Sequence, residues 1–147
     1  MSTKPFRRLG PDMIDLSVRV ERGAAKMLTE AVIASGNQIA VETPIDTGRA
    51  SGNWQASASI PIHDESGAKF PRSSIAQISG LRGVPKKGNT KLFLSNNVPY
   101  IWRLNMGWSK QAPTPFWIER AVARVFRGMI SSGRYKLTKP RWNNASH

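Results

Sequence analysis

The stretch from Lys91 to Pro113 constrains the fold most, because it is the most apolar and aromatic part of a polar, basic chain. It reads KLFLSNNVPYIWRLNMGWSKQAP. The apolar run at residues 92–94 precedes a turn-like Ser-Asn-Asn cluster, a pattern typical of the end of a buried strand. Pro99 has no amide hydrogen to donate but suits the first turn of a helix. We therefore predict a strand over 91–95 and a short helix over 99–106.

The short helix has a predicted inner and outer face. Tyr100, Ile101 and Leu104 are spaced to share the buried face. Gly107 then stands where a left-handed residue would end the helix. With Ile101 and Leu104 pointing inward, Trp102 and Arg103 would point outward. We predict this outer pair as interface residues, because Trp and Arg are enriched at interaction hot spots. Trp108 is predicted to join them.

A long amphipathic helix is predicted from Pro11 or Asp12 to Glu42. Small and apolar residues recur there at spacings of three and four, the period of one helix face. They include Leu16, Val20, Ala24, Met27, Leu28, Ala31, Val32, Ala34, Gln38, Ile39 and Val41. The alanine-rich seam favours an ordinary core helix over a coiled-coil partner. The Gly-Asn pair at 36–37 is a candidate bend, and Thr43-Pro44 ends the helix because the residue before proline avoids the helical region.

The next four residues, Asp46, Thr47, Gly48 and Arg49, are predicted to form a structural turn. Asp46 would accept backbone N–H groups and Gly48 would supply a positive φ. We also expect an ion pair between Asp46 and Arg49. A catalytic role for that pair is the competing interpretation, and the turn is favoured because Asp serves turns so often.

Residues 54–60 alternate apolar and polar side chains, which predicts a half-buried strand antiparallel to 91–95. A long loop over 61–91 follows. His63, Asp64 and Glu65 in it make a poor metal site, because the ligands are adjacent and no second His is near. Residues 73–79 fit either a helical turn or a strand. The basic loop over 83–90, with Lys86 and Lys87, lacks P-loop spacing and is predicted to meet phosphate or a neighbouring subunit.

The last predicted helix starts with Thr114 as N-cap and Pro115 at its first position. It ends at residues 131–133. Its apolar stripe is Ile118, Ala121, Val122, Val125 and Met129. Its basic stripe is Arg120, Arg124 and Arg127, spaced to share one face, and we predict that these arginines meet an acidic partner, in protein or DNA. Residues 133–147 form a basic tail that contains Trp142, another predicted interface residue.

These elements define an α+β fold. We expect a long N-terminal helix and a C-terminal helix packed on a small antiparallel sheet with a long loop. Residues 1–132 would form one domain with an N-terminal arm at 1–11, because 147 residues suit a single core.

Composition limits the chemistry open to the chain. It has no Cys, two His and only three Asp or Glu after residue 50, and it carries a net charge of +13. Thiol chemistry is excluded, and general acid–base or magnesium chemistry is disfavoured. We predict a non-enzymatic protein without catalytic residues, metal or cofactor. No apolar run is long enough for a membrane helix, and the N-terminus lacks the apolar core of a signal peptide.

The charge is concentrated in residues 51–147, which hold fifteen Lys or Arg against three acids, whereas residues 1–50 hold seven against six. A basic surplus of this size indicates nucleic acid, an acidic protein surface or a membrane headgroup layer. We favour an acidic neighbour within an assembly, with DNA contact as the alternative.

Two motifs resemble one family of tailed bacteriophages. The first is TPIDTGR at 43–49 with GNW at 52–54, and the second is NNVPY at 96–100, followed by LNMGWS at 104–109 and QAP at 111–113. Their order and spacing resemble the HK97-type, lambda gpZ-like neck or tail-completion proteins. Asn105 stands where many members of that family have Glu, so any role of that acid does not carry over.

The resemblance implies a structural virion protein of the head–tail neck or tail end, made in the host cytoplasm. It implies a homo-oligomeric ring around the DNA channel, with six subunits expected. The ring would contact other neck, head-closure, tail-terminator or tail-tube proteins, and packaged DNA without sequence specificity. A small basic DNA-binding protein is the alternative, and a lysis or nuclease enzyme is a third interpretation that the scarcity of acids disfavours.

Overall fold

The structure is a computed structural model that describes residues 6–8, 14–19, 25–86 and 90–132, with only the backbone described for the first two ranges. Its elements follow in the order β1 (Phe6–Arg8), β2 (Ile14–Arg19), α1 (Ala25–Glu42), β3 (Trp54–Ala58), α2 (Phe70–Ser79), the 3-10 helix η1 (Gly80–Gly83), β4 (Lys91–Asn96), α3 (Ile101–Asn105) and α4 (Trp117–Ser131).

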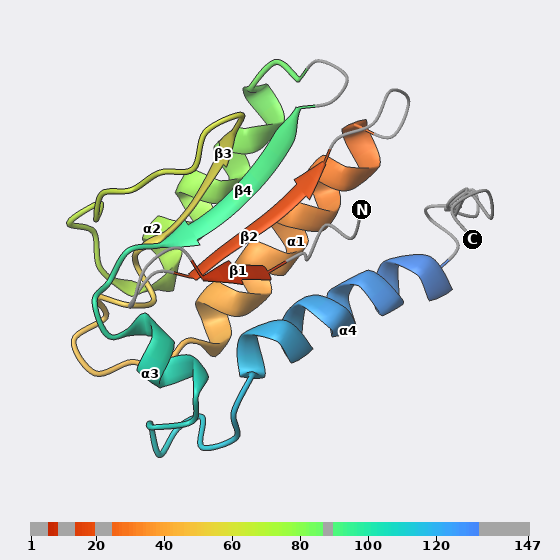
Figure 1. The fold of residues 1–147 in the computed structure, drawn as a ribbon. Helices are drawn as coiled ribbons and strands as arrows, with labels where there is room; N and C mark the ends of the chain where they lie inside the picture. The colour runs from red at the N-terminus through yellow and green to blue at the C-terminus, as the bar shows by residue number, and fades with distance from the viewer. Residues whose placement is uncertain (1–5, 9–13, 20–24, 87–89, 133–147) are drawn as a thin grey trace.

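The strands form one antiparallel sheet in the order β1-β2-β4-β3, with β4 at its centre (Figure 1). Leu94 of β4 is in register with Leu16 of β2 and with Ala56 of β3. The predicted α+β class is confirmed, and so is the antiparallel pairing of the strand at 54 with the strand at 91. Strand β3 stops at Ala58, short of the predicted end at residue 60, because Ser59 has a positive φ of 73°.

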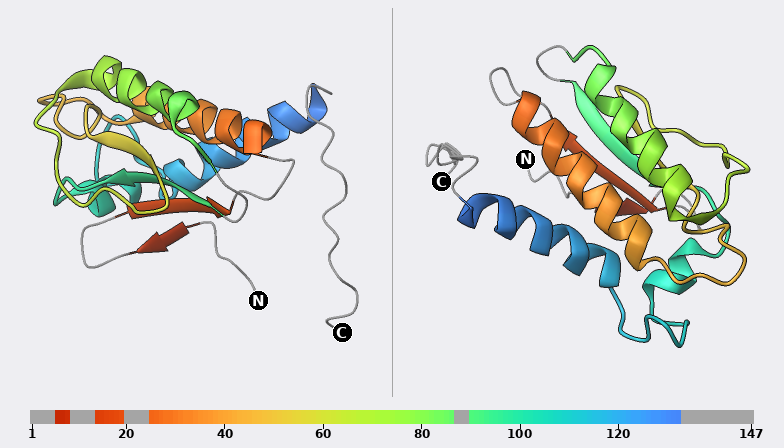
Figure 2. Two further views of the ribbon diagram at one scale, coloured as in Figure 1. Left: turned by 90° about the horizontal axis from the view of Figure 1, so that it is seen from above. Right: turned by 180° about the vertical axis from the view of Figure 1, so that it is seen from behind.

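Helices α1 and α2 lie over one face of the sheet, and α4 lies beside α1 on the side away from α2 (Figure 2). The core forms between these helices and the sheet. Its largest fully buried side chains are Trp54, Ile33, Ile39, Ile78, Leu81, Leu92, Leu94, Ile101, Ile118, Val32 and Val98. Burial of such side chains supplies most of the driving force for folding.

The predicted start of the long N-terminal helix at Pro11 or Asp12 is wrong. Residues 14–19 form β2, and α1 begins only at Ala25. The local sequence Ile-Asp-Leu-Ser-Val-Arg alternates apolar and polar residues, which is the period of a strand. The segment pairs with β4 in an antiparallel arrangement. Within the predicted arm, Phe6–Arg8 pair with β2 as β1.

Gly36 allows close packing in the middle of α1, which runs through it without interruption. An added Cβ there would lie 2.9 Å from Ile78 Cδ1 of α2 and 3.1 Å from Leu94 Cδ1 of β4. At this glycine, the candidate bend of the sequence, α1 therefore packs tightly against both α2 and the sheet.

The predicted long loop at 61–91 contains α2 and η1, so a helix occupies the segment for which helix and strand competed. Helix α2 also covers the outer edge of β3. The Trp54 N–H donates to Ser74 Oγ at 3.0 Å. The Ala56 N–H donates to Gln77 Oε1 at 2.6 Å, and Gln77 Nε2 donates to the Ala56 carbonyl at 3.0 Å. These bonds satisfy an edge that would otherwise pair with another chain.

Candidate interaction surface

The turn after α1 is built on Thr43 and Gly48. The Thr43 hydroxyl donates to the Ile39 carbonyl at 2.7 Å and accepts the Trp54 indole N–H at 2.8 Å, which fixes the end of α1 to the start of β3. Gly48 has a φ of 84°, so the predicted positive φ is confirmed. Its carbonyl accepts the Phe70 N–H at 2.8 Å, which joins the turn to α2.

The second motif forms α3 and the loop after it. Ile101 is fully buried, and Gly107 follows the helix with a φ of 89°, as its predicted helix-ending role requires. A Cβ at Gly107 would collide with the Pro113 carbonyl. The loop therefore folds back closely on the end of α3.

Asn105 links that loop to α4. Its side chain is completely buried; Oδ1 accepts the Ile118 N–H at 3.0 Å and Nδ2 donates to both Glu119 carboxylate oxygens at 3.0 Å. Its carbonyl accepts the Phe116 N–H at 2.7 Å. Asn105 thus caps a helix that begins twelve residues later in the sequence, at Trp117, with Phe116 in the N-cap position.

The predicted capping by Thr114 and Pro115 is therefore wrong. Helix α4 begins at Trp117, and its N-cap residue Phe116 has a φ of 61°. The cap is supplied from α3 instead, and the Trp117 indole N–H donates to the Leu104 carbonyl at 2.7 Å to hold the same junction. The predicted end of the helix near residue 131 is confirmed.

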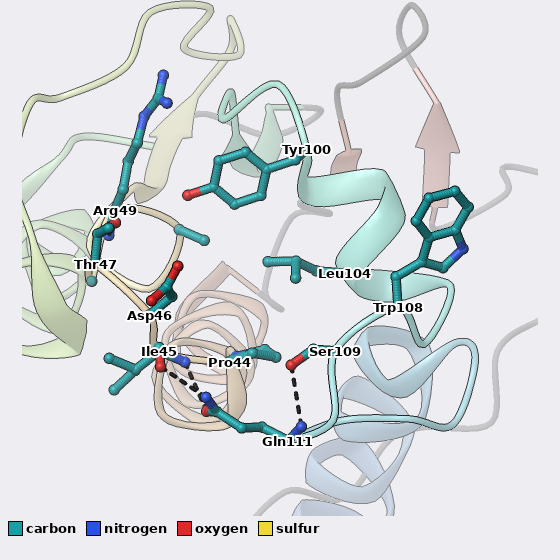
Figure 3. Close-up of a pocket in the computed structure, with 12 residues that line it drawn as sticks. Pro44, Ile45, Asp46, Thr47, Arg49, Tyr100, Leu104, Trp108, Ser109 and Gln111 are labelled. Carbon is teal, nitrogen blue, oxygen red and sulfur yellow. Dashed lines mark hydrogen bonds between the residues drawn. The ribbon is translucent and has the colours of Figure 1, made fainter.

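The two motifs meet through Gln111. Its amide accepts the Ile45 N–H at 2.9 Å and donates to the Ile45 carbonyl at 2.8 Å, so it pairs with the turn as a strand would (Figure 3). A cavity of about 560 Å³ lies between the turn and α3. Eleven of the twelve residues that line it belong to the two motifs, and Ala50 lies between the two parts of the first motif: Pro44, Ile45, Asp46, Thr47, Gly48, Arg49, Ala50, Tyr100, Leu104, Trp108, Ser109 and Gln111.

The expected ion pair between Asp46 and Arg49 does not form. Arg49 instead pairs with Glu65, Nε to Oε1 at 2.9 Å and Nη2 to Oε2 at 2.8 Å. Its guanidinium also lies 5.8 Å from the centre of the Tyr100 ring, within cation–π range. The hydrogen bonds with Glu65 raise the pKa of Arg49. The Thr47 hydroxyl accepts the Arg49 backbone N–H at 3.3 Å. The Asp46 carboxylate had been expected to accept backbone N–H groups in this turn.

The aromatic interface candidates differ in exposure. Trp108 is 73% exposed, and the exposed Arg103 guanidinium lies 5.5 Å from the centre of its ring. Trp102 is half-buried and packs against the core. Figure 3 shows the Trp108 indole pointing away from Leu104, although Trp108 is one of the residues that line the cavity.

The arginines of the α4 stripe are all exposed but are engaged differently. Arg124 Nη2 donates to both Glu42 carboxylate oxygens, at 2.6 and 2.7 Å, and so joins α4 to α1. Arg120 donates to the backbone carbonyls of Thr114 and Pro115. Arg127 has no hydrogen bond or ion pair within the described part of the chain.

Lys86, the remaining basic candidate within the described residues, does not line the cavity. Lys86 donates to the carbonyls of Leu81 and Val84, which ties it to η1. Burial lowers its pKa. Arg82 pairs with Glu30 at 2.8 Å, and its hydrogen bonds lower the pKa of that carboxyl. Lys87 and Trp142 lie outside the described residues.

Several residues of this surface carried no separate signal in the sequence. In the sequence, Gln111 was only the first residue of the QAP motif, and Glu65 was only one of three adjacent residues that make a poor metal site. Their partners lie 66 and 16 residues away, so local spacing could not reveal them. Within the described ranges, no group of three or more His, Cys, Asp or Glu could hold a metal ion. No helix among those residues is both long and apolar enough to cross a membrane.

Comparisons with known protein families, with curated proteins and with solved structures find no match for this chain.

Proposed function

We propose that this chain is a non-enzymatic structural subunit of a bacteriophage particle. It would occupy the head–tail neck or the end of the tail, as one member of a homo-oligomeric ring around the DNA channel. Its partners would be further copies of itself and neighbouring neck, head-closure, tail-terminator or tail-tube proteins. We take the kind of assembly, a phage neck or tail end, from the resemblance of the two motifs to neck or tail-completion proteins.

The observation that carries the proposal is the meeting of those motifs in space. Residues 44–50 and 100–111 line one cavity and are joined by the two Gln111–Ile45 hydrogen bonds. The motifs thus build a single surface feature rather than two separate turns. Two motifs from distant parts of the sequence would thus contribute to one contact surface.

Exposed side chains near this feature support an interaction role. Trp108 is 73% exposed, Phe116 48% and Ile45 39%. Trp108 is also paired with the exposed Arg103. Exposed aromatic and Arg side chains of this kind are the usual anchors of protein interfaces.

A small basic DNA-binding protein is the second candidate, favoured by the surplus of twelve positive charges in residues 51–147. The structure weighs against a continuous phosphate-binding stripe on α4. Arg124 is already neutralised by Glu42, and Arg120 is held by backbone carbonyls. Phosphate binding depends on lysines and arginines that are free to replace counterions.

Size-exclusion chromatography combined with a salt-titrated DNA shift separates the two candidates. The structural subunit is expected to self-associate and to bind duplex DNA only weakly. A DNA-binding protein would remain a monomer or dimer and bind free duplex with an affinity that falls steeply as salt rises. This second result would contradict the proposal, as would magnesium-dependent cleavage of the DNA.

A further inference from the structure

Asp46 is an acid that has no partner among the described residues of a strongly basic chain. Six acidic side chains are described, and four of them have partners: Glu30 with Arg82, Glu42 with Arg124, Glu65 with Arg49, and Glu119 with Asn105. Asp46 and Asp64 have none among the described residues. Of these two, only Asp46 lines the cavity.

The cavity pairs this carboxylate with apolar walls. Leu104 of α3 and Tyr100, the N-cap residue of that helix, lie opposite Asp46, and Pro44 and Ile45 lie beside it (Figure 3). Arg49, at the upper rim, is already bound to Glu65 and does not neutralise Asp46. An apolar cleft with one free carboxylate suits a long basic side chain, whose methylene stem packs on the walls while its charged head meets the acid.

Helix α4 presents such a side chain on its outer face. Ala123, Arg127 and Ile130 are exposed and recur at i, i+4 and i+7, which places them on one stripe. The neighbouring Arg124 is held by Glu42, whereas Arg127 is free of partners within the described residues. Ile130 is 49% exposed beside it. The stripe therefore combines a free guanidinium with exposed apolar surface.

We infer that the cavity receives the outer face of α4 from a second copy of this chain, with Arg127 of that copy meeting Asp46. The inference rests on the proposed function, because it names the contact through which the ring would close. The choice of a second copy follows from charge complementarity, since each chain carries both an acid without a partner in the cavity and an arginine without a partner on α4, among the described residues.

The contact would be head-to-tail. The cavity and the α4 stripe are different surfaces of one chain, so each copy would give its stripe to one neighbour and its cavity to the other. Interfaces of this heterologous kind generate rings when the rotation closes. The geometry is thus the kind that a ring subunit requires.

A charge-reversal cycle tests the contact. Asp46→Arg and Arg127→Glu each place like charges at the interface, and each is expected to weaken self-association, measured by sedimentation equilibrium, by at least about tenfold. The double variant Asp46→Arg/Arg127→Glu restores opposite charges and is expected to recover most of the association. Circular dichroism confirms that each variant is folded.

Two matched variants control for net charge. Asp64→Arg changes the other described acid without a partner, and Arg72→Glu changes an exposed arginine of α2 outside both surfaces. Both are expected to associate as the wild type does. Undiminished association of Asp46→Arg, or no recovery in the double variant, would overturn the inference while leaving the proposed function intact. A wild-type chain that stays monomeric and binds duplex DNA would overturn both.

Discussion

At the scale of single residues, Asn105 does the most to position the candidate surface. It is buried, and its amide satisfies both the first turn of α4 and the Glu119 carboxylate. Through it, the loop at 106–116 is held between α3 and α4. The loop in turn carries Gln111, which closes the cavity against Ile45.

We predict that Asn105→Ala lowers the free energy of unfolding by about 2 kcal/mol, because it leaves the Ile118 N–H and the Glu119 carboxylate without a buried partner. Urea denaturation measures the change. Asn97→Ala is the control, since the half-buried Asn97 donates mainly to the Ile62 carbonyl, and its loss is expected to cost about 1 kcal/mol or less. Equal effects would show that Asn105 has no special structural role.

Residue-scale inference from sequence succeeded where the cause is local. The positive φ values of Gly48 and Gly107 follow from turn chemistry that the neighbouring residues display. It failed for Asp46 and Arg49, because Glu65 lies sixteen residues from Arg49 and only the fold brings the two together. The cap from Asn105 was missed for the same reason.

At the scale of elements, the edge of β3 depends on α2. Ser74 and Gln77 hydrogen-bond the outward backbone groups of Trp54 and Ala56, so the strand does not present an open edge there. Open edges of this kind invite pairing with other chains.

We predict that Gln77→Ala destabilises the chain by about 1–2 kcal/mol and increases its aggregation on mild heating, because the Ala56 backbone groups lose their partner. Thermal unfolding with light scattering measures both effects. Gln38→Ala removes an exposed amide bonded only to Glu42 on the same helix and should cost no more than about 0.5 kcal/mol. An unchanged aggregation temperature in Gln77→Ala would argue against the protective role of α2.

Two helical glycines make a second pair of tests. Gly128 in α4 has nothing within 4 Å of an added Cβ, so Gly128→Ala is expected to stabilise the chain by about 1 kcal/mol through helix propensity. Gly36→Ala gains the same propensity but forces a methyl against Ile78 and Leu94, and we expect a net loss of about 1 kcal/mol. Chemical denaturation decides the sign, and a similar gain in both variants would show that α1 is not closely packed at Gly36.

Element-scale inference placed β3, β4, α3 and α4, whose periods are clear, although β3 ends before its predicted end and α4 starts after its predicted start at Pro115. It failed for residues 14–19. The spacings of three and four led to the prediction of a helix there, but the local alternation of apolar and polar residues is that of a strand, and the segment forms β2. It left α2 undecided, because the face that meets β3 is polar and carries Ser74 and Gln77 rather than an apolar stripe.

At the scale of the whole molecule, the net charge opposes self-association, and the proposed contact at the cavity would have to overcome it. A chain with a net charge of +13 repels its own copies unless specific contacts compensate. The free carboxylate in the cavity and the free Arg127 on α4 offer one such contact for every copy added. Self-association of the chain is therefore expected to be specific and stoichiometric, and not to be non-specific aggregation.

The α+β class followed from the sequence, since helical and strand periods occur in separate segments. The joining of residues 44–50 to residues 100–111 did not, although both segments were recognised as motifs. Their contact depends on how the loop after α3 folds back, which Gly107, Asn105 and Gln111 determine together.

The mass of the assembled protein distinguishes a closed ring from a monomer and from an open chain of subunits. Native mass spectrometry of the concentrated wild-type chain should give one dominant oligomer whose mass is a fixed multiple of 16.3 kDa, with the same multiple as concentration rises, because a head-to-tail ring has a defined number of places. A monomer at every concentration, or a ladder of masses without a preferred size, would contradict the account.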